Sequence, residues 1–433
     1  MNANRTTARA ELFSYVGLDV NADSLIAHYE LDGRAFSEVV TFDRIGPLTT
    51  PAVTAVAQLW YLLAGLSYYK AGAAARIDLG HTPVGPTGRV LLRAALVDGL
   101  GEFSFCNNLD LNDVKIEGGT SGERYSPGVD ISRVLVPFGG GIDSVVTLSE
   151  LSDQLDQTLF VVSPVSGTFA PLEETALVTG LPIVRATRAL DPQILSGNDE
   201  FLNGHVPVTA MVTMLAVIAA LATRRGGVVM SNEHSSSIPN LQWHGRDINH
   251  QWSKSWAAET LIADAVAEIV GDTFVVASYL RDRSEVWVAQ TFSELTRFHH
   301  VFRSCNRAFA QLPGARATTW CGECDKCLFT NLILAPFLSR ADLREIFDAE
   351  PLSDVARKEQ LRTLVGLGVT HKPFECVGDP DESAVALTKV STMREWSDVE
   401  HLAEIAQLVS PNRDFNELLA SQGASRVPAH WLR

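Results

Sequence analysis

Three consecutive glycines stand between a short apolar run and an Asp-Ser pair, and this arrangement suits phosphate binding. We expect a buried strand over Val134–Phe138, then the glycines, then a helix starting near Asp143. Glycines let the backbone turn sharply, and the helix start points free N–H groups and a positive dipole end at a ligand. Ser144 adds a hydroxyl donor, while Asp143 either caps the helix or helps to hold Mg²⁺. The residues predicted to bind phosphate groups are Gly139, Gly140, Gly141, Asp143 and Ser144.

This glycine loop differs from two common nucleotide-binding motifs and is close to a third. No Gly-Lys-Ser/Thr follows it, as in a Walker A loop, and it lacks the G-x-G-x-x-G spacing of dinucleotide-binding folds. It resembles the PP-loop signature Ser-Gly-Gly-x-Asp-Ser of the ATP pyrophosphatases, which cleave ATP to AMP and pyrophosphate while activating a carboxyl, carbonyl or similar oxygen. Gly139 stands where that family usually has Ser, so one hydroxyl contact to pyrophosphate is missing from the pattern. The alternative is a plain glycine turn between strand and helix.

Four of the six cysteines fall close together, and their spacing indicates a metal site. A C-x₂-C-x₂-C run follows a fourth cysteine, and four thiolates suit tetrahedral Zn²⁺, although an Fe–S cluster would use the same ligands. We expect structural zinc in a reducing compartment, because four protein ligands leave no open position for chemistry. A similar late zinc knuckle occurs in the PP-loop 7-cyano-7-deazaguanine synthases. Cys106 and Cys376 are isolated and are interpreted as small apolar residues. The predicted ligands are Cys305, Cys321, Cys324 and Cys327.

A polar stretch, Ser231–Glu259, follows the apolar run Gly227–Met230. Its apolar residues show neither a helical nor a strand period over residues 231–253, which predicts a long loop entering a helix. Loops at the carboxyl ends of parallel strands commonly bind ligands, and this one combines groups that can bind an acidic substrate, hold a metal and move protons. A solvated surface loop is the alternative. The candidate residues are Asn232, Glu233, His234, Arg246, His250 and Lys254.

Strands and helices alternate from Ser132 onward, which favours an α/β fold with a doubly wound parallel sheet. Earlier in the chain, Leu25–Leu31 and Phe36–Phe42 are predicted strands joined by an Asp-Gly turn, and the pattern after residue 340 is helical. We therefore predict a mixed α/β domain over residues 1–130 and a PP-loop ATP-binding domain with its cysteine knuckle over residues 131–340. A helical region would cover residues 341–433.

The charge and the apolar runs of the sequence bear on the kinds of partner and the cellular location to expect for this chain. The formal net charge is −16 without a compensating block of Lys and Arg, so nucleic acid is not expected as a partner. The N-terminus carries no apolar stretch of signal-peptide length, which favours a cytoplasmic location. The longest apolar run, Val206–Thr223, approaches the length of a membrane span, but it contains Pro207 and three threonines. We predict a buried helix there and no membrane insertion.

Several motifs, in this order along the chain, resemble the MurL family of UDP-N-acetyl-α-D-muramoyl-L-alanyl-L-glutamate epimerases. They are FGGGIDS (138–144), NGHVPVTA (203–210), the polar stretch, WCGECDKC (320–327) and KPFECVG (372–378). The resemblance covers roughly residues 131–380, and more loosely the whole chain. It implies that ATP and Mg²⁺ adenylate the α-carboxylate of the terminal L-Glu of a UDP-muramoyl dipeptide and that pyrophosphate leaves. A base would then remove the Cα proton, another group would return it on the opposite face, and hydrolysis would release AMP and the D-glutamyl product for peptidoglycan synthesis.

On this resemblance the glycine loop binds the phosphates and Asp143 holds or orients Mg²⁺. Lys254 or Arg246 would neutralise the substrate carboxylates or pyrophosphate. His250, His234 and Glu233 are candidate proton carriers, and the sequence does not rank them. Two alternatives stay open: a PP-loop ligase that captures the adenylate with ammonia, as in the deazaguanine and asparagine-forming enzymes, and a non-catalytic nucleotide-binding module. The oligomeric state is also left open.

Overall fold

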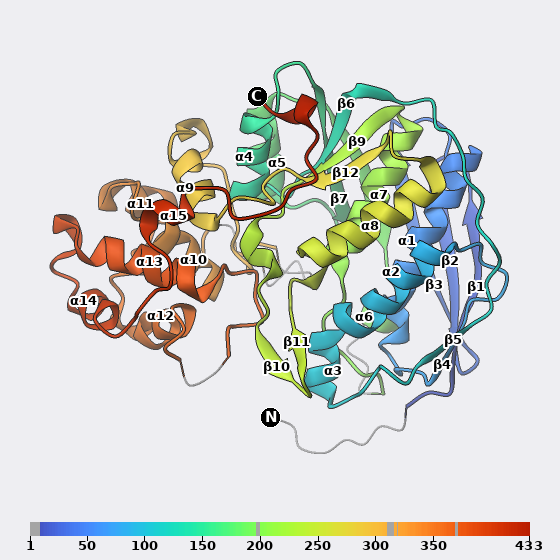
Figure 1. Ribbon diagram of the computed structural model, residues 1–433, viewed down its shortest axis with the longest axis horizontal. Helices are drawn as coiled ribbons and strands as arrows, with labels where there is room; N and C mark the ends of the chain where they lie inside the picture. The colour runs from blue at the N-terminus through green and yellow to red at the C-terminus, as the bar shows by residue number, and fades with distance from the viewer. Residues whose placement is uncertain (1–8, 196–199, 310–315, 318, 369–370) are drawn as a thin grey trace.

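A ten-stranded sheet runs through the molecule in the order β12-β9-β6-β7-β8-β3-β2-β1-β4-β5 (Figure 1). The computed structural model describes residues 9–195, 200–309, 316–317, 319–368 and 371–433. The five strands from β12 to β8 are parallel to one another. Their bounds are β6 Asp130–Pro137, β7 Asp156–Pro164, β8 Ile183–Ala189, β9 Arg225–Met230 and β12 Val275–Ser278.

In the parallel part of the sheet, the direction in which the chain adds new strands reverses at β6. The chain runs from β6 outward to β7 and β8, then crosses to β9 and β12 on the other side of β6. At such a switch point the connections leave in opposite directions, which opens a crevice outside the carboxyl ends of the two neighbouring strands. The topology therefore favours a crevice at the ends of β6 and β9, where the glycine loop begins.

Helices cover both faces of this sheet, which confirms the predicted α/β class. Phe160 and Val228 face a core shared with α1, α7 and α8, whereas Leu159 and Val161 face a second core shared with α4, α9 and α10. The helices are α1 Pro51–Tyr69, α4 Ile142–Glu150, α5 Ala170–Thr179, α7 Val208–Ala222, α8 Trp256–Val270, α9 Glu285–Ser293 and α10 Asp325–Leu334.

The predicted buried helix is α7. It packs between the sheet and α1, so most of its residues are buried. A helix that is covered in this way is expected to be apolar on every side. Among the described residues, no helix is long and apolar enough to cross a membrane.

The N-terminal region extends the same sheet. Both predicted strands are present as β2 and β3, and their hairpin turns through Asp32 and Gly33, which have φ of 47° and 82°. β3 pairs antiparallel with β8, so the sheet continues across the predicted boundary at residue 130. The elements of this region are β1 Leu12–Val20, β2 Ser24–Leu31, β3 Arg34–Asp43, β4 Arg76–Asp78, α2 Pro86–Ala94, α3 Gly101–Asn107 and β5 Lys115–Glu117. β1 was not predicted.

The polar stretch is not one long loop, which corrects the sequence prediction. It contains a short antiparallel hairpin, β10 Leu241–Trp243 and β11 Arg246–Ile248, between two 3₁₀ turns at His234–Ser237 and Trp252–Lys254. His244 and Gly245 form the hairpin turn with φ of 49° and 74°. Because both turn residues have positive φ, the backbone reverses tightly between β10 and β11.

The C-terminal region is helical, as predicted, and most of its helices pack into the second core, which they share with β7, α4, α9 and α10. Its helices are α11 Arg340–Phe347, α12 Lys358–Leu364, α13 Pro380–Ser391, α14 Glu400–Ala406 and α15 Phe415–Leu418. The last residues return to the sheet (Figure 1). There Trp431 packs against Val134, Val229 and Ala277. The division of the chain at residues 130 and 340 stays a prediction.

Candidate active site

A cavity of about 430 Å³ lies where β6 and β9 end. One wall is the glycine loop, and the others come from the residues after β9, the 3₁₀ turn before α8, and segments of the C-terminal half of the chain. Its polar lining residues are Asp143, Ser144, Thr209, Ser231, Asn232, Lys254, Arg303, Ser304, Lys326 and Cys376. The structure therefore brings together the two motifs that the sequence analysis singled out separately, the glycine loop and part of the polar stretch.

The geometry of the loop favours glycine at two of the three positions, and most strongly at Gly140. Gly140 has a φ of +74°, and a Cβ there would lie 3.0 Å from Cα of Leu172. Gly141 precedes the first turn of α4, and a Cβ there would lie 2.9 Å from Oγ of Ser304. Gly139 differs, since a Cβ would meet no atom within 4 Å. The serine that the PP-loop signature has at this position would therefore fit.

Asp143 projects from the first turn of α4 and lines the cavity. Its Oδ1 is buried and has no hydrogen-bond partner among the described residues. Burial, and then the nearby charge of Glu233, raise the pKa of Asp143 to about 6, although Lys326 and Lys254 oppose the shift. The neighbouring Ser144 donates its hydroxyl to the carbonyl oxygen of Gly141 at 3.0 Å, which closes the turn. Asp143 thus has an oxygen available for a ligand or cation.

Lys254 supplies positive charge on the opposite wall. Its Nζ lies 3.4 Å from Sγ of Cys376 and 3.4 Å from Oε1 of Gln251. Burial lowers the pKa of Lys254, but the charges of Cys376, Glu233 and Asp143 outweigh it and leave the pKa raised. The lysine is therefore held in its charged form, within a group of potential anions.

Glu233 and Asn232 are buried beside the end of β9. Oε1 of Glu233 accepts a hydrogen bond from the Ser235 hydroxyl at 3.0 Å, and Nδ2 of Asn232 donates to Oγ of Ser278 at 3.0 Å. Asn232 also lines the cavity, whereas Glu233 acts on Asp143 and Lys254 through its charge.

Cys376 was interpreted as an apolar filler, and that interpretation is wrong. Its thiol lines the cavity beside Lys254. Burial raises the pKa of this thiol, but the charge of Lys254, a hydrogen bond from His250 and the charge of Lys326 lower it to about 6. The KPFECVG motif contained this residue, but a lone cysteine has no spacing pattern that would mark it as functional.

His250 links Cys376 to the N-terminal half of the chain. Its Nδ1 is hydrogen-bonded to the carboxylate of Glu102 in α3, and its ring centroid lies 4.3 Å from that of His205. Burial lowers the pKa of His250, but hydrogen bonds to Cys376 and Glu102 outweigh it and raise the pKa to about 9. Burial and the charge of His250 lower the pKa of His205 to about 4. The sequence analysis did not identify Glu102.

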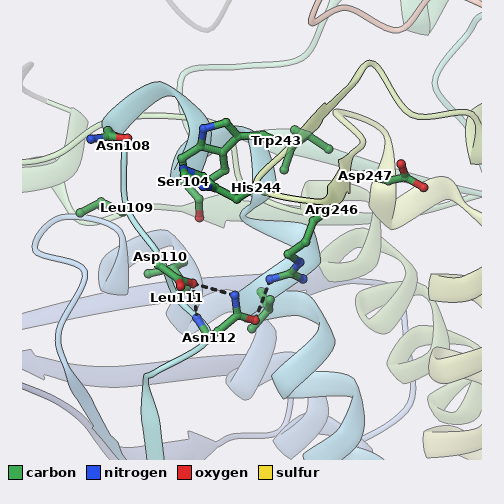
Figure 2. A pocket seen from close by; sticks show the side chains of 13 residues that line it. Ser104, Asn108, Leu109, Asp110, Leu111, Asn112, Trp243, His244, Arg246 and Asp247 are labelled. Carbon is green, nitrogen blue, oxygen red and sulfur yellow. Dashed lines mark hydrogen bonds between the residues drawn. The ribbon is translucent and has the colours of Figure 1, made fainter.

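Four candidate residues of the polar stretch do not line this cavity, and they are Glu233, His234, Arg246 and His250. His234 packs near the C-terminal segment, with its backbone N–H donating to the carbonyl of Arg283 at 2.9 Å. Arg246 lies on the hairpin and lines a separate cavity of about 390 Å³ against α3 (Figure 2). Its guanidinium pairs with Asp98 and donates to Oδ1 of Asn112 at 2.8 Å. The structure therefore does not bring Arg246 to the glycine loop.

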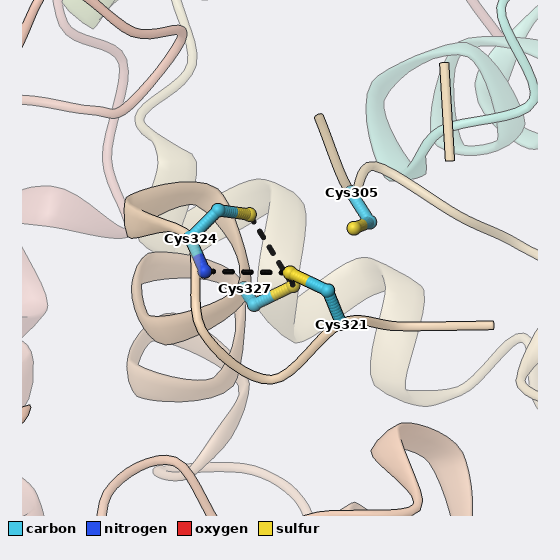
Figure 3. A group of neighbouring side chains, drawn as sticks. All are labelled: Cys305, Cys321, Cys324 and Cys327. Carbon is cyan, nitrogen blue, oxygen red and sulfur yellow. Dashed lines mark hydrogen bonds between the residues drawn. The ribbon is translucent and has the colours of Figure 1, made fainter. Parts of the chain in front are cut away.

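The four predicted cysteine ligands form one cluster (Figure 3). All four Sγ atoms lie within 4.8 Å of one another, with 3.7 Å between Cys321 and Cys327 and 3.5 Å between Cys324 and Cys327. A tetrahedral metal with Zn–S bonds of about 2.3 Å would place its sulfur ligands about 3.8 Å apart. The backbone N–H groups of Glu323 and Cys324 both point at Sγ of Cys321 at 3.4 Å, which suits a thiolate. The cluster thus has the donors and the size of a metal site.

Comparisons with known proteins match almost the whole chain. Residues 3–279 match the family model of the MurL N-terminal domain, and residues 301–418 match that of the MurL C-terminal domain. The chain belongs to the MurL family.

Three relatives bear the name UDP-N-acetyl-alpha-D-muramoyl-L-alanyl-L-glutamate epimerase. The protein of Salinispora tropica is 36% identical over 424 residues, which are 94% of this chain and 90% of the relative. That of a Micromonospora species is 36% identical over 411 residues, 91% of this chain and 90% of the relative. That of Xanthomonas oryzae pv. oryzae is 34% identical over 399 residues, 90% of this chain and 87% of the relative.

The two MurL domains meet at the cavity. The N-terminal domain contributes the glycine loop and Lys254, and the C-terminal domain contributes Lys326 and Cys376. Such a site is complete only when the two domains pack together, and the cysteine cluster lies in the C-terminal one.

Proposed function

We propose that this chain is an ATP-dependent epimerase that converts the terminal L-Glu of UDP-N-acetyl-α-D-muramoyl-L-alanyl-L-glutamate to D-Glu, in peptidoglycan precursor synthesis. The names of its MurL relatives support the substrate and the reaction. The observation that carries the ATP dependence is the glycine loop, which opens into a cavity lined by Asp143 and Lys254 at the switch point of the sheet.

ATP would bind with its phosphates on the glycine loop. The N-terminus of α4 and the loop amides favour anions there, and the membership in the PP-loop superfamily that we infer from the motif agrees with this placement. Lys254 and Lys326 would balance the phosphate charge from the other walls. The apolar lining that could receive the adenine base is Phe138, Phe160, Val162, Phe169, Leu172, Val212, Met230 and Phe309.

Asp143 fits as the ligand for Mg²⁺. Its buried Oδ1 has no partner among the described residues, and carboxylate oxygens together with substrate phosphates are the usual ligands of this ion. Mg²⁺ bound there would neutralise charge on the phosphates of ATP.

Adenylation solves the chemical difficulty of this epimerisation. A free carboxylate carries negative charge, which strongly opposes the formation of a carbanion at the neighbouring Cα. When the carboxylate oxygen attacks the α-phosphorus of ATP, pyrophosphate leaves and the acyl-adenylate no longer carries that charge. The carbonyl can then accept the electron pair as an enolate when a base takes the Cα proton. Hydrolysis of the acyl-adenylate after reprotonation releases AMP and the product.

We further propose that Cys305, Cys321, Cys324 and Cys327 hold a structural zinc ion. The four sulfur donors would fill its coordination sphere, which leaves no position for substrate. Because Cys324 directly precedes α10, a metal there would fix the helix that carries Lys326 toward the cavity.

The experiment is an incubation of the protein with ATP, Mg²⁺ and the L-Glu dipeptide substrate in D₂O. We expect D-Glu product carrying deuterium at Cα, together with AMP and pyrophosphate, and none of these products from Asp143→Ala. Added ammonia should change neither rate nor product, whereas AMP formation that requires ammonia would favour the ligase alternative. Turnover of ATP with an unlabelled, unchanged glutamate would contradict the epimerase function.

A further inference from the structure

Glu102 is hydrogen-bonded to His250, and His250 acts on Cys376, whose thiol lines the cavity. The carboxylate of Glu102 is hydrogen-bonded to Nδ1 of His250, and the imidazole in turn lowers the pKa of the Cys376 thiol. The three residues come from distant parts of the sequence: α3, the segment after β11, and the segment before α13. A carboxylate that orients a histidine, which in turn contacts a thiol, is the arrangement that activates cysteines in enzymes.

The charges around the thiol favour its ionised form. Lys254 lies 3.4 Å from Sγ, and the pKa of Cys376 falls to about 6 although burial alone would raise it. The charged groups that act on the thiol are the cations Lys254, His250, Lys326 and Lys372 and the carboxylates Asp143 and Glu375. Near neutral pH this balance leaves a thiolate beside charged Lys254 and His250, in a cavity that it shares with the glycine loop.

We propose that Cys376 is the base that removes the Cα proton of the adenylated glutamate, and that His250 and Glu102 are positioning residues that hold it as a thiolate. This inference rests on the proposed function, because it needs the acyl-adenylate as its substrate. The geometry supports it because Cys376 and the glycine loop line one cavity, so an acyl group joined to AMP would lie within the space that the thiol faces.

The proton transfer balances without any further reagent. The thiolate electron pair forms an S–H bond while the Cα–H bond breaks, and its electrons move into the acyl carbonyl to give an enolate. A proton that originates from water then reaches Cα on the opposite face, and the carbonyl re-forms. The Cys376 thiol returns its proton to solvent before the next cycle. Lys254 and the His250–Glu102 pair stay protonated and paired throughout.

Glu102, His205 and His250 are also close enough to be considered as metal ligands. However, Nδ1 of His250 and the Glu102 carboxylate are within hydrogen-bonding distance of each other, so the donor atoms that would bind an ion already bind each other. The low pKa of His205 keeps that ring neutral beside the charged His250. The pairing of Glu102 with His250 therefore fits a role in orienting the imidazole near Cys376 better than a role in binding a metal ion.

The first test separates adenylation from proton transfer in Cys376→Ser. Two rates are measured with the full-length protein and the L-Glu substrate: exchange of labelled pyrophosphate into ATP, and deuterium incorporation at Cα in D₂O. We expect Cys376→Ser to keep pyrophosphate exchange within about threefold of wild type and to lose about 100-fold or more of the deuterium incorporation. Cys106→Ser, which changes an exposed cysteine outside the cavity, is the matched control and should keep both rates.

The second test uses the pH dependence of deuterium incorporation. In wild type the rate should rise with pH as Cys376 ionises, with a midpoint near pH 6. His250→Asn removes a cation and a hydrogen-bond donor from the thiolate, so the midpoint should move upward by about one pH unit or more. Glu102→Gln should shift it in the same direction by a smaller amount. A merely structural role for His250 would lower the rate equally at all pH values.

Three outcomes would overturn the proposal. Deuterium incorporation by Cys376→Ser within about tenfold of wild type would mean that another group is the base. Loss of pyrophosphate exchange in that variant would place Cys376 in adenylation instead. An unshifted pH midpoint in His250→Asn would remove the pairing from the mechanism. If wild type itself lacks pyrophosphate exchange, the proposed function has failed, which is a distinct result.

Discussion

Residues of the polar stretch line two separate cavities, and the charged groups of these cavities differ in whether they have partners within the protein. In the cavity at the ends of β6 and β9, Oδ1 of Asp143 is buried without a partner among the described residues, and several like charges crowd together. In the cavity at the hairpin, Asp110 accepts a hydrogen bond from Asn112 at 2.7 Å (Figure 2). Arg246 pairs with Asp98, and Asp247 accepts from Gln242 at 3.1 Å. Charged groups that have partners within the protein hold the hairpin in place. A buried carboxylate oxygen without a partner, as in Asp143, instead indicates a binding site for a ligand.

The largest expected effect comes from Asp143→Ala compared with Arg246→Ala. Asp143→Ala should lower substrate-dependent AMP formation by about 100-fold or more, since it removes the carboxylate that we assign to Mg²⁺. Arg246→Ala should lower it by no more than about threefold, because its partly exposed ion pair with Asp98 contributes little. Initial rates of AMP release measure both. If Arg246→Ala instead raises KM strongly at constant kcat, the hairpin cavity also binds substrate, and the contrast between the cavities is lost.

The second effect compares two glycines of one loop. Gly140→Ala should lower pyrophosphate exchange by about tenfold or more, because alanine at positive φ is strained and its Cβ would press on the backbone at Leu172. Gly139→Ser should keep the rate within about threefold and lower KM for ATP, since the hydroxyl enters open space and adds a donor. Equal losses in the two variants would mean that the loop does not hold the phosphates in this conformation.

The third effect concerns the metal, and it should appear mainly in stability. We expect about one zinc ion per chain in the purified protein by elemental analysis, and a Tm lowered by about 5 °C or more in Cys324→Ser. Cys106→Ser, which lies outside the cluster, should leave the Tm unchanged within about 1 °C. Protein without bound metal but with full activity and an unchanged Tm would refute the structural zinc.

The smallest effect tests whether the hairpin ion pair matters for folding. Arg246→Ala should lower the free energy of unfolding by about 1 kcal/mol or less, because the pair is partly exposed to solvent. Urea unfolding followed by tryptophan fluorescence measures it. A loss above about 3 kcal/mol would show that the pair supports the site through the fold.

The sequence predicted the features whose residues are close together in the chain. The strand, the glycines and the helix at Val134–Leu148 form one local motif, and the spacing of the four cysteines is likewise local. The alternation of strands and helices was enough to predict the class of the sheet. In each case the physical signal, an apolar run or a ligand spacing, lies within about ten to twenty residues.

The remaining features depend on contacts between distant segments. Glu102 and Cys376 are more than 250 positions apart, and no local pattern relates them to His250. The pairing of β3 with β8, which joins the N-terminal strands to the parallel sheet, is equally non-local. Arg246 was grouped with Lys254 because both lie in the polar stretch, but Arg246 belongs to the hairpin, whose residues line the other cavity.

The central claim is that this cavity joins AMP to the glutamyl carboxylate, and isotope transfer tests it most directly. The substrate is prepared with ¹⁸O in the α-carboxylate of its L-Glu and turned over with unlabelled ATP and Mg²⁺. Because the carboxylate oxygen attacks the α-phosphorus and water later attacks the acyl carbon, we predict one ¹⁸O atom in the AMP by mass spectrometry. Epimerised product together with unlabelled AMP, or with ADP in place of AMP, would contradict the account.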